Sequence, residues 1–169
     1  YAAQTATIAG PLAWHFEEAG DYQRAIRYLI LTAKNAAGRW AYGDAIRVLE
    51  HARSLVHRLA ANARSQAEIE LLQCIGDAHF GRNAMIECAQ AYEAAAARAA
   101  DTGFTSARLD ALSSLVRPLC FIDPDRAMAA IEQALHLSAN LDDPLLHART
   151  ELLGAYVRLT FDTWREKDW

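Results

Sequence analysis

A few polar side chains lie close enough together in the sequence to suggest chemistry. His147 and Glu151 have i,i+4 spacing, so on a helix they share one face and could ligate a metal or form an ion pair. Two ligands make an incomplete metal site, and we therefore expect the ion pair. His15 precedes Glu17 and Glu18, and we interpret this trio as the polar end of a helix and not as an acid–base cluster.

The sequence motifs that usually mark an active site are absent. The chain has no GxxxxGK[ST] phosphate loop, no GxSxG nucleophile elbow and no HExxH zinc motif. Its cysteines, Cys74, Cys88 and Cys120, are far apart and form no CxxC pair, which predicts reduced core residues. We therefore expect no catalytic residue, no metal and no cofactor, and predict that the chain is not an enzyme.

Composition limits the kind of partner that the protein can have. The 169 residues carry a net charge of -4, and acidic and basic side chains alternate without long runs of one sign. This balance argues against direct nucleic-acid binding, which needs clustered Lys and Arg. No apolar run reaches the roughly 18 residues of a membrane span, and no signal peptide is evident. We expect a cytoplasmic protein that does not enter the membrane.

Helix is the only secondary structure with sustained support in the sequence. Ala, Leu, Ile, Arg and Glu dominate, and alternating β-branched runs are absent. Short breaks rich in Gly, Asp, Asn and Pro divide the chain into segments of helical length, and such short connections make neighbouring helices antiparallel. The pattern predicts an all-α fold of about eight antiparallel helices near residues 3–19, 22–37, 41–58, 64–80, 84–101, 104–119, 124–140 and 144–166.

Some helix boundaries have specific markers. In Asp123-Pro124 and Asp143-Pro144 an acidic residue that can accept orphan backbone N–H bonds precedes a proline at the first helical position. Pro118 falls near the end of a predicted helix, where we expect an end or a kink.

Other residues suggest how the helices pack. Gly76 and Gly154 lie within helical patterns and predict close helix contacts. Trp40 lies beside a turn, and we expect it to pack against its neighbouring helix.

The segment Ala13-Trp14-His15-Phe16-Glu17-Glu18-Ala19-Gly20-Asp21-Tyr22-Gln23-Arg24-Ala25-Ile26 resembles the centre of a tetratricopeptide repeat. Small residues at helix crossings and large ones between them are typical of such packing. The small contact recurs at Ala25, Ala45, Cys88 and Ala127. These spacings are uneven, and the last two exceed the roughly 34 residues of the family. The resemblance implies a right-handed α-α superhelix, with the helix at 22–37 shared between two units.

Part of the sequence is also similar to the helical region of large bacterial signal-transduction ATPases, which include the maltose-type transcription activators. Residues 12–49, 121–124 and 142–150 are typical of that group. In these proteins the repeats act as sensor or autoinhibitory arms, and the nucleotide-binding and output modules lie elsewhere. Because the sequence starts at Tyr1 and not at methionine, we expect residues 1–169 to be a single repeat domain within a longer protein.

The resemblance places the ligand-facing residues on the first helix of each repeat. It implies a groove that binds a protein segment or a sister domain; the alternative is a small-molecule effector sensor. The fourth set of register positions is apolar: Leu109, Leu112, Val116 and Leu119. These residues could form a hydrophobic peptide site or belong to the core, and we favour the core. The candidate groove residues are Trp14, Glu17, Arg27, Lys34, Glu70, Gln73, Asp77 and Phe80.

The C-terminal register is open to two readings. Leu153-Gly154 could fill the paired positions of a first helix, or Lys167-Asp168-Trp169 could form the next turn, which we favour. In the second reading the aromatic residues near the end would lack a covering helix. This predicts possible self-association through Phe161, Trp164 and Trp169.

Overall fold

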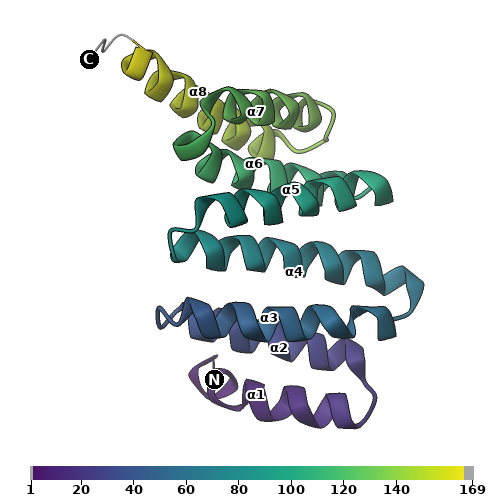
Figure 1. Ribbon diagram of the computed structural model, residues 1–169. Coiled ribbons are helices and arrows are strands. Elements are labelled where there is room, and N and C mark those ends of the chain that lie inside the picture. The colour runs from purple at the N-terminus through teal and green to yellow at the C-terminus, as the bar shows by residue number, and fades with distance from the viewer. Residues whose placement is uncertain (1, 166–169) are drawn as a thin grey trace.

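The protein is an all-α array of helices that follow one another in a stack (Figure 1). The computed structural model describes the backbone of residues 2–165 and the side chains of residues 8–159 and of Phe161. Within these residues there are eight α-helices, a short 3-10 turn at Val56–Arg58 and no strand. The helices are α1 (Ala2–Glu18), α2 (Tyr22–Ala37), α3 (Tyr42–Leu55), α4 (Ala61–Gly81), α5 (Met85–Thr102), α6 (Thr105–Ile122), α7 (Pro124–Ala139) and α8 (Pro144–Arg165).

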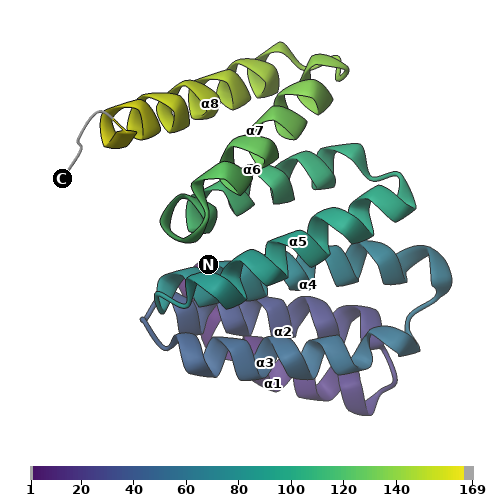
Figure 2. The same cartoon turned by 45° about the horizontal axis from the view of Figure 1, so that its top comes forward.

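The helices form two rows, and the helices of one row lie closer together than those of the other. Each helix packs on the next along the chain, as Figures 1 and 2 show. Helices α2 and α4, α4 and α6, and α6 and α8 also approach each other closely. Among the described residues no such contact joins α1 to α3, α3 to α5 or α5 to α7. The even-numbered helices therefore form the tighter, inner row of the array, and the odd-numbered helices form the outer row.

Aspartate caps start the helices where the sequence predicts them. Asp123 Oδ1 accepts a hydrogen bond from the Arg126 backbone N–H at 3.1 Å. Asp143 Oδ1 accepts one from the Leu146 N–H at 2.9 Å. In both cases proline occupies the first helical position, where its missing N–H has no intrahelical partner to lose. The predicted capping of α7 and α8 is confirmed.

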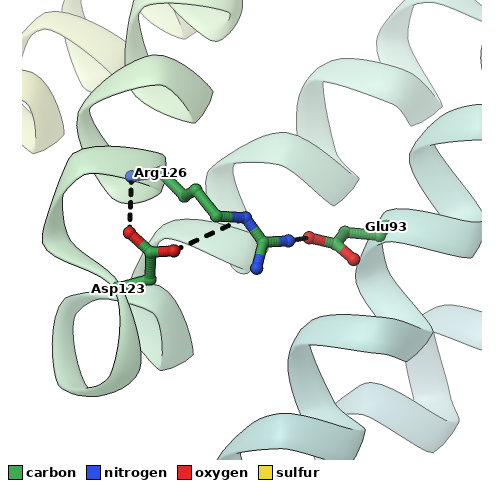
Figure 3. A network of polar contacts seen from close by, with 3 residues as sticks. All are labelled: Glu93, Asp123 and Arg126. Carbon is green, nitrogen blue, oxygen red and sulfur yellow. Dashed lines mark hydrogen bonds and ion pairs between the residues drawn. The ribbon is translucent and has the colours of Figure 1, made fainter.

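Long polar side chains bridge two of the gaps between outer-row helices. Arg126 of α7 reaches across to Glu93 of α5, and its Nε also lies 3.9 Å from the Asp123 carboxylate (Figure 3). Glu17 of α1 is linked in the same way to His51 of α3, with 2.8 Å between Oε2 and Nε2. Exposed pairs of this kind contribute little stability, so the inner row carries most of the packing.

Apolar side chains form two core clusters that meet at α4. One cluster covers α1 to α4 and includes Ala91 of α5, and the other runs from α4 to α8. The positions that the repeat pattern predicts to be small contacts are all buried: Ala25, Ala45, Cys88 and Ala127. The apolar set on α6 is also core, as predicted: Leu109, Leu112, Val116 and Leu119 are buried.

Glycines permit the closest contacts between neighbouring helices. A Cβ on Gly76 would lie 2.7 Å from the ring of Tyr92, so only glycine lets α5 place this ring against α4. Gly81, at the C-terminal end of the same helix, faces the Tyr42 ring of α3 with no room for a side chain. A Cβ on Gly154 of α8 would lie 3.3 Å from the Ile131 side chain of α7. The predicted close contacts at Gly76 and Gly154 are confirmed.

Pro118 does not end its helix, contrary to one of the expectations from the sequence. Helix α6 continues past this buried proline to Ile122. Proline removes the N–H that would bond the carbonyl of Ser114, and a proline inside a helix usually leaves that carbonyl unpaired. Ser114 lines an open cleft, where solvent can hydrogen-bond the freed carbonyl and so allow the helix to continue.

Trp40 also departs from the expectation, since it does not pack into a helix interface. Its side chain is 80% exposed, and its only ring neighbour among the described residues is Tyr42, at 6.1 Å between centroids. Its backbone adopts a left-handed conformation with φ 64°, the same conformation that Gly20 adopts with φ 73° in the preceding turn. The turn geometry therefore places Trp40 outside the core.

We predict that Trp40→Gly raises the free energy of unfolding by up to about 1 kcal/mol. Glycine removes the strain of a left-handed residue with a side chain, and little contact is lost. Gly20→Ala is the matched control: no atom crowds its Cβ position, so the backbone alone should lower stability by about 1 kcal/mol. Urea unfolding followed by circular dichroism measures both changes. A Trp40→Gly protein less stable than the parent would contradict this interpretation.

Candidate functional site

A band of depressions follows the inner row of helices. Four of them lie between successive even-numbered helices, with volumes of about 300, 540, 580 and 780 Å³. We call this surface, made by the facing sides of α2, α4, α6 and α8, the concave band. Ligand sites in proteins commonly occupy recesses of this size, so the concave band is the candidate functional site.

The first depression separates α2 from α4. Arg27 and Ile30 of α2 face Gln66 and Glu70 of α4 across a cavity of about 300 Å³. Lys34 lies one turn further along α2, and its Nζ is 3.7 Å from the Glu70 carboxylate. Three of the predicted groove residues thus lie together here, with a cation on one wall and a carboxylate on the other.

The second depression lies between α4 and the start of α6. Its wall includes Glu70 and Gln73 from α4 and Phe104 from the turn before α6. The Gln73 amide lies 3.5 Å from the Ala107 carbonyl, at the limit of a hydrogen bond. Amide and carbonyl groups at this point offer donors and acceptors to a bound backbone.

A cluster of four side chains joins α4, α5 and α6 at the middle of the concave band. The Tyr92 hydroxyl donates to the Asp77 carboxylate at 2.6 Å, although the rest of Tyr92 is only 1% exposed. Arg117 of α6 lies 3.7 Å from Asp77 and 3.4 Å from the Tyr92 hydroxyl. Its guanidinium stacks 4.5 Å above the centre of the Phe80 ring. These contacts hold Arg117 in place with its outer side toward solvent.

The buried tyrosine of this cluster has a strongly shifted pKa. Burial, and after it the hydrogen bond to the Asp77 carboxylate, raises the pKa of the Tyr92 phenol above its ordinary value of about 10. Tyr92 therefore stays protonated and remains a hydrogen-bond donor throughout the neutral range.

Two further recesses lie between α6 and α8 and share Arg117, Leu153 and Tyr156 as a common wall. The first, of about 580 Å³, is apolar. The second, of about 780 Å³, contains more polar groups, including Ser113, Ser114 and Arg149. The apolar recess is lined by Phe80, Val116, Arg117, Cys120, Phe121, Pro124, Leu153, Tyr156, Val157 and Phe161.

The polar recess carries charges of both signs, from Asp110 and from Arg117 and Arg149. Desolvation by the cleft walls raises the pKa of the Asp110 carboxyl, and the positive charge of Arg149 opposes this shift. Asp110 and Arg149 both keep contact with solvent. The polar recess can therefore bind groups of either charge near its two rims.

The cysteines differ in accessibility. Burial raises the pKa of the Cys74 thiol to about 11 and that of the Cys88 thiol to about 12, so both remain protonated at neutral pH. Both are core residues, as the sequence predicts, whereas Cys120 is half-buried and lines the apolar recess. Within the described residues no group of three or more His, Cys, Asp and Glu side chains could hold a metal ion.

Six of the eight groove residues expected from the sequence lie on α2 and α4, along the concave band; the other two do not. Trp14 is 60% exposed on α1, which belongs to the outer row, and Glu17 is paired with His51 of α3. His147 and Glu151 lie side by side as expected, with 3.5 Å between the His147 Nε2 and the Glu151 carboxylate. Phe161 is half-buried in the apolar recess. The side chain of Trp164 and all of Trp169 lie outside the described residues.

Sequence reasoning missed the contribution of α6 and α8. Arg117 follows Val116 in an apolar stretch, and it is not among the groove residues that the resemblance implies. The apolar residues around Arg117 were the signal that could have found it, because a charged side chain on a largely apolar helix needs a position beside a cleft or at the surface. Tyr156 and Leu153 could not be placed without knowing which side of α8 faces α6.

Comparisons with known proteins define no family for this chain. No protein-family model matches it, and no curated protein matches it significantly. The fold therefore defines the class of the protein, an all-α helical repeat array. None of the described helices combines the length and the apolar character that crossing a bilayer requires.

We predict that Tyr92→Phe lowers the free energy of unfolding by about 1–2 kcal/mol at pH 7, because a hydrogen bond to a carboxylate is lost. The raised pKa has a further consequence with a definite sign. The stability that the protonated Tyr92 phenol contributes is complete below pH 10 and decreases as the pH rises above that value. The reason is that the phenol loses its proton more readily in the unfolded chain than in the folded one. Denaturant titrations between pH 7 and 11 measure this decrease.

The parent protein should therefore lose stability relative to Tyr92→Phe as the pH rises from about 10 to 11. Asp77→Asn is the matched control, since it keeps an oxygen acceptor for the tyrosine hydroxyl and should cost less stability at pH 7. Parallel pH profiles for the parent and Tyr92→Phe would contradict the raised pKa.

Proposed function

We propose that the protein is an interaction arm whose concave band binds a protein segment or a sister domain. The observation that supports this most strongly is the continuity of the band, because successive depressions follow one row of four helices. Helical repeat proteins commonly use such an extended inner surface for binding. The resemblance of the sequence to tetratricopeptide regions of bacterial signalling ATPases and transcription regulators supports the same role, in the cytoplasm.

The lining of the band suggests how a segment would be bound. Gln73 and the charged pair of Lys34 and Glu70 offer polar contacts to an extended backbone near α2 and α4. An apolar side chain of the ligand would enter the recess beside Phe80 and Leu153. Such an anchor would supply most of the affinity, since buried apolar and aromatic contacts dominate interface energetics.

A second candidate is a small-molecule effector sensor. The apolar recess has a volume of about 580 Å³, within the range of pockets that hold drug-sized ligands, and Arg117 lies at its edge. A thermal-shift screen with metabolites distinguishes this candidate, because a small ligand that binds only the folded state raises the melting temperature without any peptide present.

The interaction role can be tested with peptides selected from a random library against the full chain. We predict that Phe80→Ala weakens binding of the selected peptides about tenfold or more. Gln73→Ala and Lys34→Ala should weaken it by smaller factors. The matched controls lie on the outer row: Arg47→Ala and Glu132→Ala should change affinity less than about twofold.

Cys120 gives an independent readout of the same binding. It is the cysteine that lines the apolar recess, so bound peptide should slow its alkylation, and Cys120→Ser should abolish the labelling without abolishing binding. Peptides whose affinity depends on the outer-row variants, and not on Phe80, would contradict the proposal.

A further inference from the structure

Helix α8 has apolar residues on two opposite sides. One side packs into the array through Gly154 and Val157, which are buried, with Leu146 and Leu153 partly buried beside them. The opposite side is not covered by any described part of the chain, and α8 forms the end of the stack in Figure 1. This uncovered side is nevertheless apolar.

The uncovered side repeats with heptad spacing. Leu145, Leu152 and Leu159 recur every seventh residue and are 81%, 72% and 67% exposed. Ala148 and Ala155 lie between them at the second heptad position and are also exposed. We call these five residues the Leu/Ala seam. A seam of large and small residues at the two core positions allows a second helix to approach closely, with leucines opposite alanines.

Charged and aromatic side chains flank the seam on both sides. Glu151 and Arg158 border one edge, and Arg149 and Tyr156 border the other. All four are exposed. The flanking positions of a helix pair determine which partner is accepted, in which direction and in which register.

We propose that the Leu/Ala seam binds the α8 helix of a second copy of this chain, antiparallel and related by a two-fold axis. In this arrangement Leu152 lies opposite Ala155 of the second copy, and Ala148 lies opposite Leu159. Two-fold symmetry makes each contact occur twice. Most of the interface is on the other side of α8 from its packing against α6 and α7. At one edge it borders the polar recess, which Leu152, Arg149 and Tyr156 also line.

The flanking residues select this register over its neighbours. With Leu152 opposite Ala155, Glu151 of each copy meets Arg158 of the other, and Arg149 meets the ring of Tyr156. A shift by one heptad step in one direction would bring Glu151 against Glu151 and Arg149 against Arg149. A shift in the other direction would bring Arg158 against Arg158. Only the middle register pairs opposite charges.

The same residues disfavour a parallel pair. In a parallel arrangement Glu151 would face Tyr156, so the charge complementarity between Glu151 and Arg158 would be lost. The seam extends over only two heptads, fewer than the three or four of a stable coiled coil. We therefore expect a weak dimer, with a dissociation constant of about 10 µM to 1 mM.

Sedimentation equilibrium of the full chain over this concentration range tests the proposal. Leu152→Glu places a charge at the centre of the seam, and we expect it to weaken association tenfold or more, to about the limit of detection. Ile86→Glu is the matched control: Ile86 is also exposed, at 61%, but lies on α5, and its substitution should leave association unchanged. Circular dichroism melts confirm that both variants fold.

Charge reversal tests the antiparallel register itself. Glu151→Arg or Arg158→Glu alone should weaken association about tenfold, because each places like charges together twice. The double variant restores opposite charges and should return the dissociation constant to within about threefold of the parent. A chain that is monomeric at all concentrations, or a dimer insensitive to Leu152→Glu, or a double variant as weak as the single ones, would overturn the proposal.

Discussion

The contact on which the site depends most is the close approach of Tyr92 to Gly76. With no side chain at Gly76, the Tyr92 ring lies against the backbone of α4 and fills the space between α4 and α5. Its hydroxyl then emerges beside Asp77, and this pair receives Arg117 from α6. A packing constraint inside the core thus fixes the polar groups in the middle of the concave band. Since α4 contributes to both apolar clusters, the same helix also connects the two halves of the array.

The division into an inner and an outer row explains why binding is expected on one face only. Inner-row helices approach each other closely at a few points, and recesses remain between them elsewhere. Outer-row helices are further apart, and long side chains such as those of Arg126 and Glu93 span the distance (Figure 3). The ion pairs that bridge outer-row helices are exposed, and such pairs contribute solubility more than specificity.

Local rules were enough to predict the helices, and they failed where long-range packing decides. The caps at Asp123 and Asp143 and the small contacts at Ala25 and Ala45 follow from neighbouring residues, and all of them are present. The assignment of α1 to the groove side followed from treating α1 and α2 as the first repeat. The row to which a helix belongs depends on contacts with helices two places away, which no local pattern records. That is why Trp14 was expected on the same face as Lys34.

The central claim is that the inner row is the binding face, and amide hydrogen exchange of the full chain with a library-selected peptide tests it most directly. Binding should slow exchange in the parts of α2, α4, α6 and α8 that line the concave band, and should leave α3, α5 and α7 unchanged. Protection concentrated on α3, α5 and α7 would contradict the account, because it would place the ligand on the outer row.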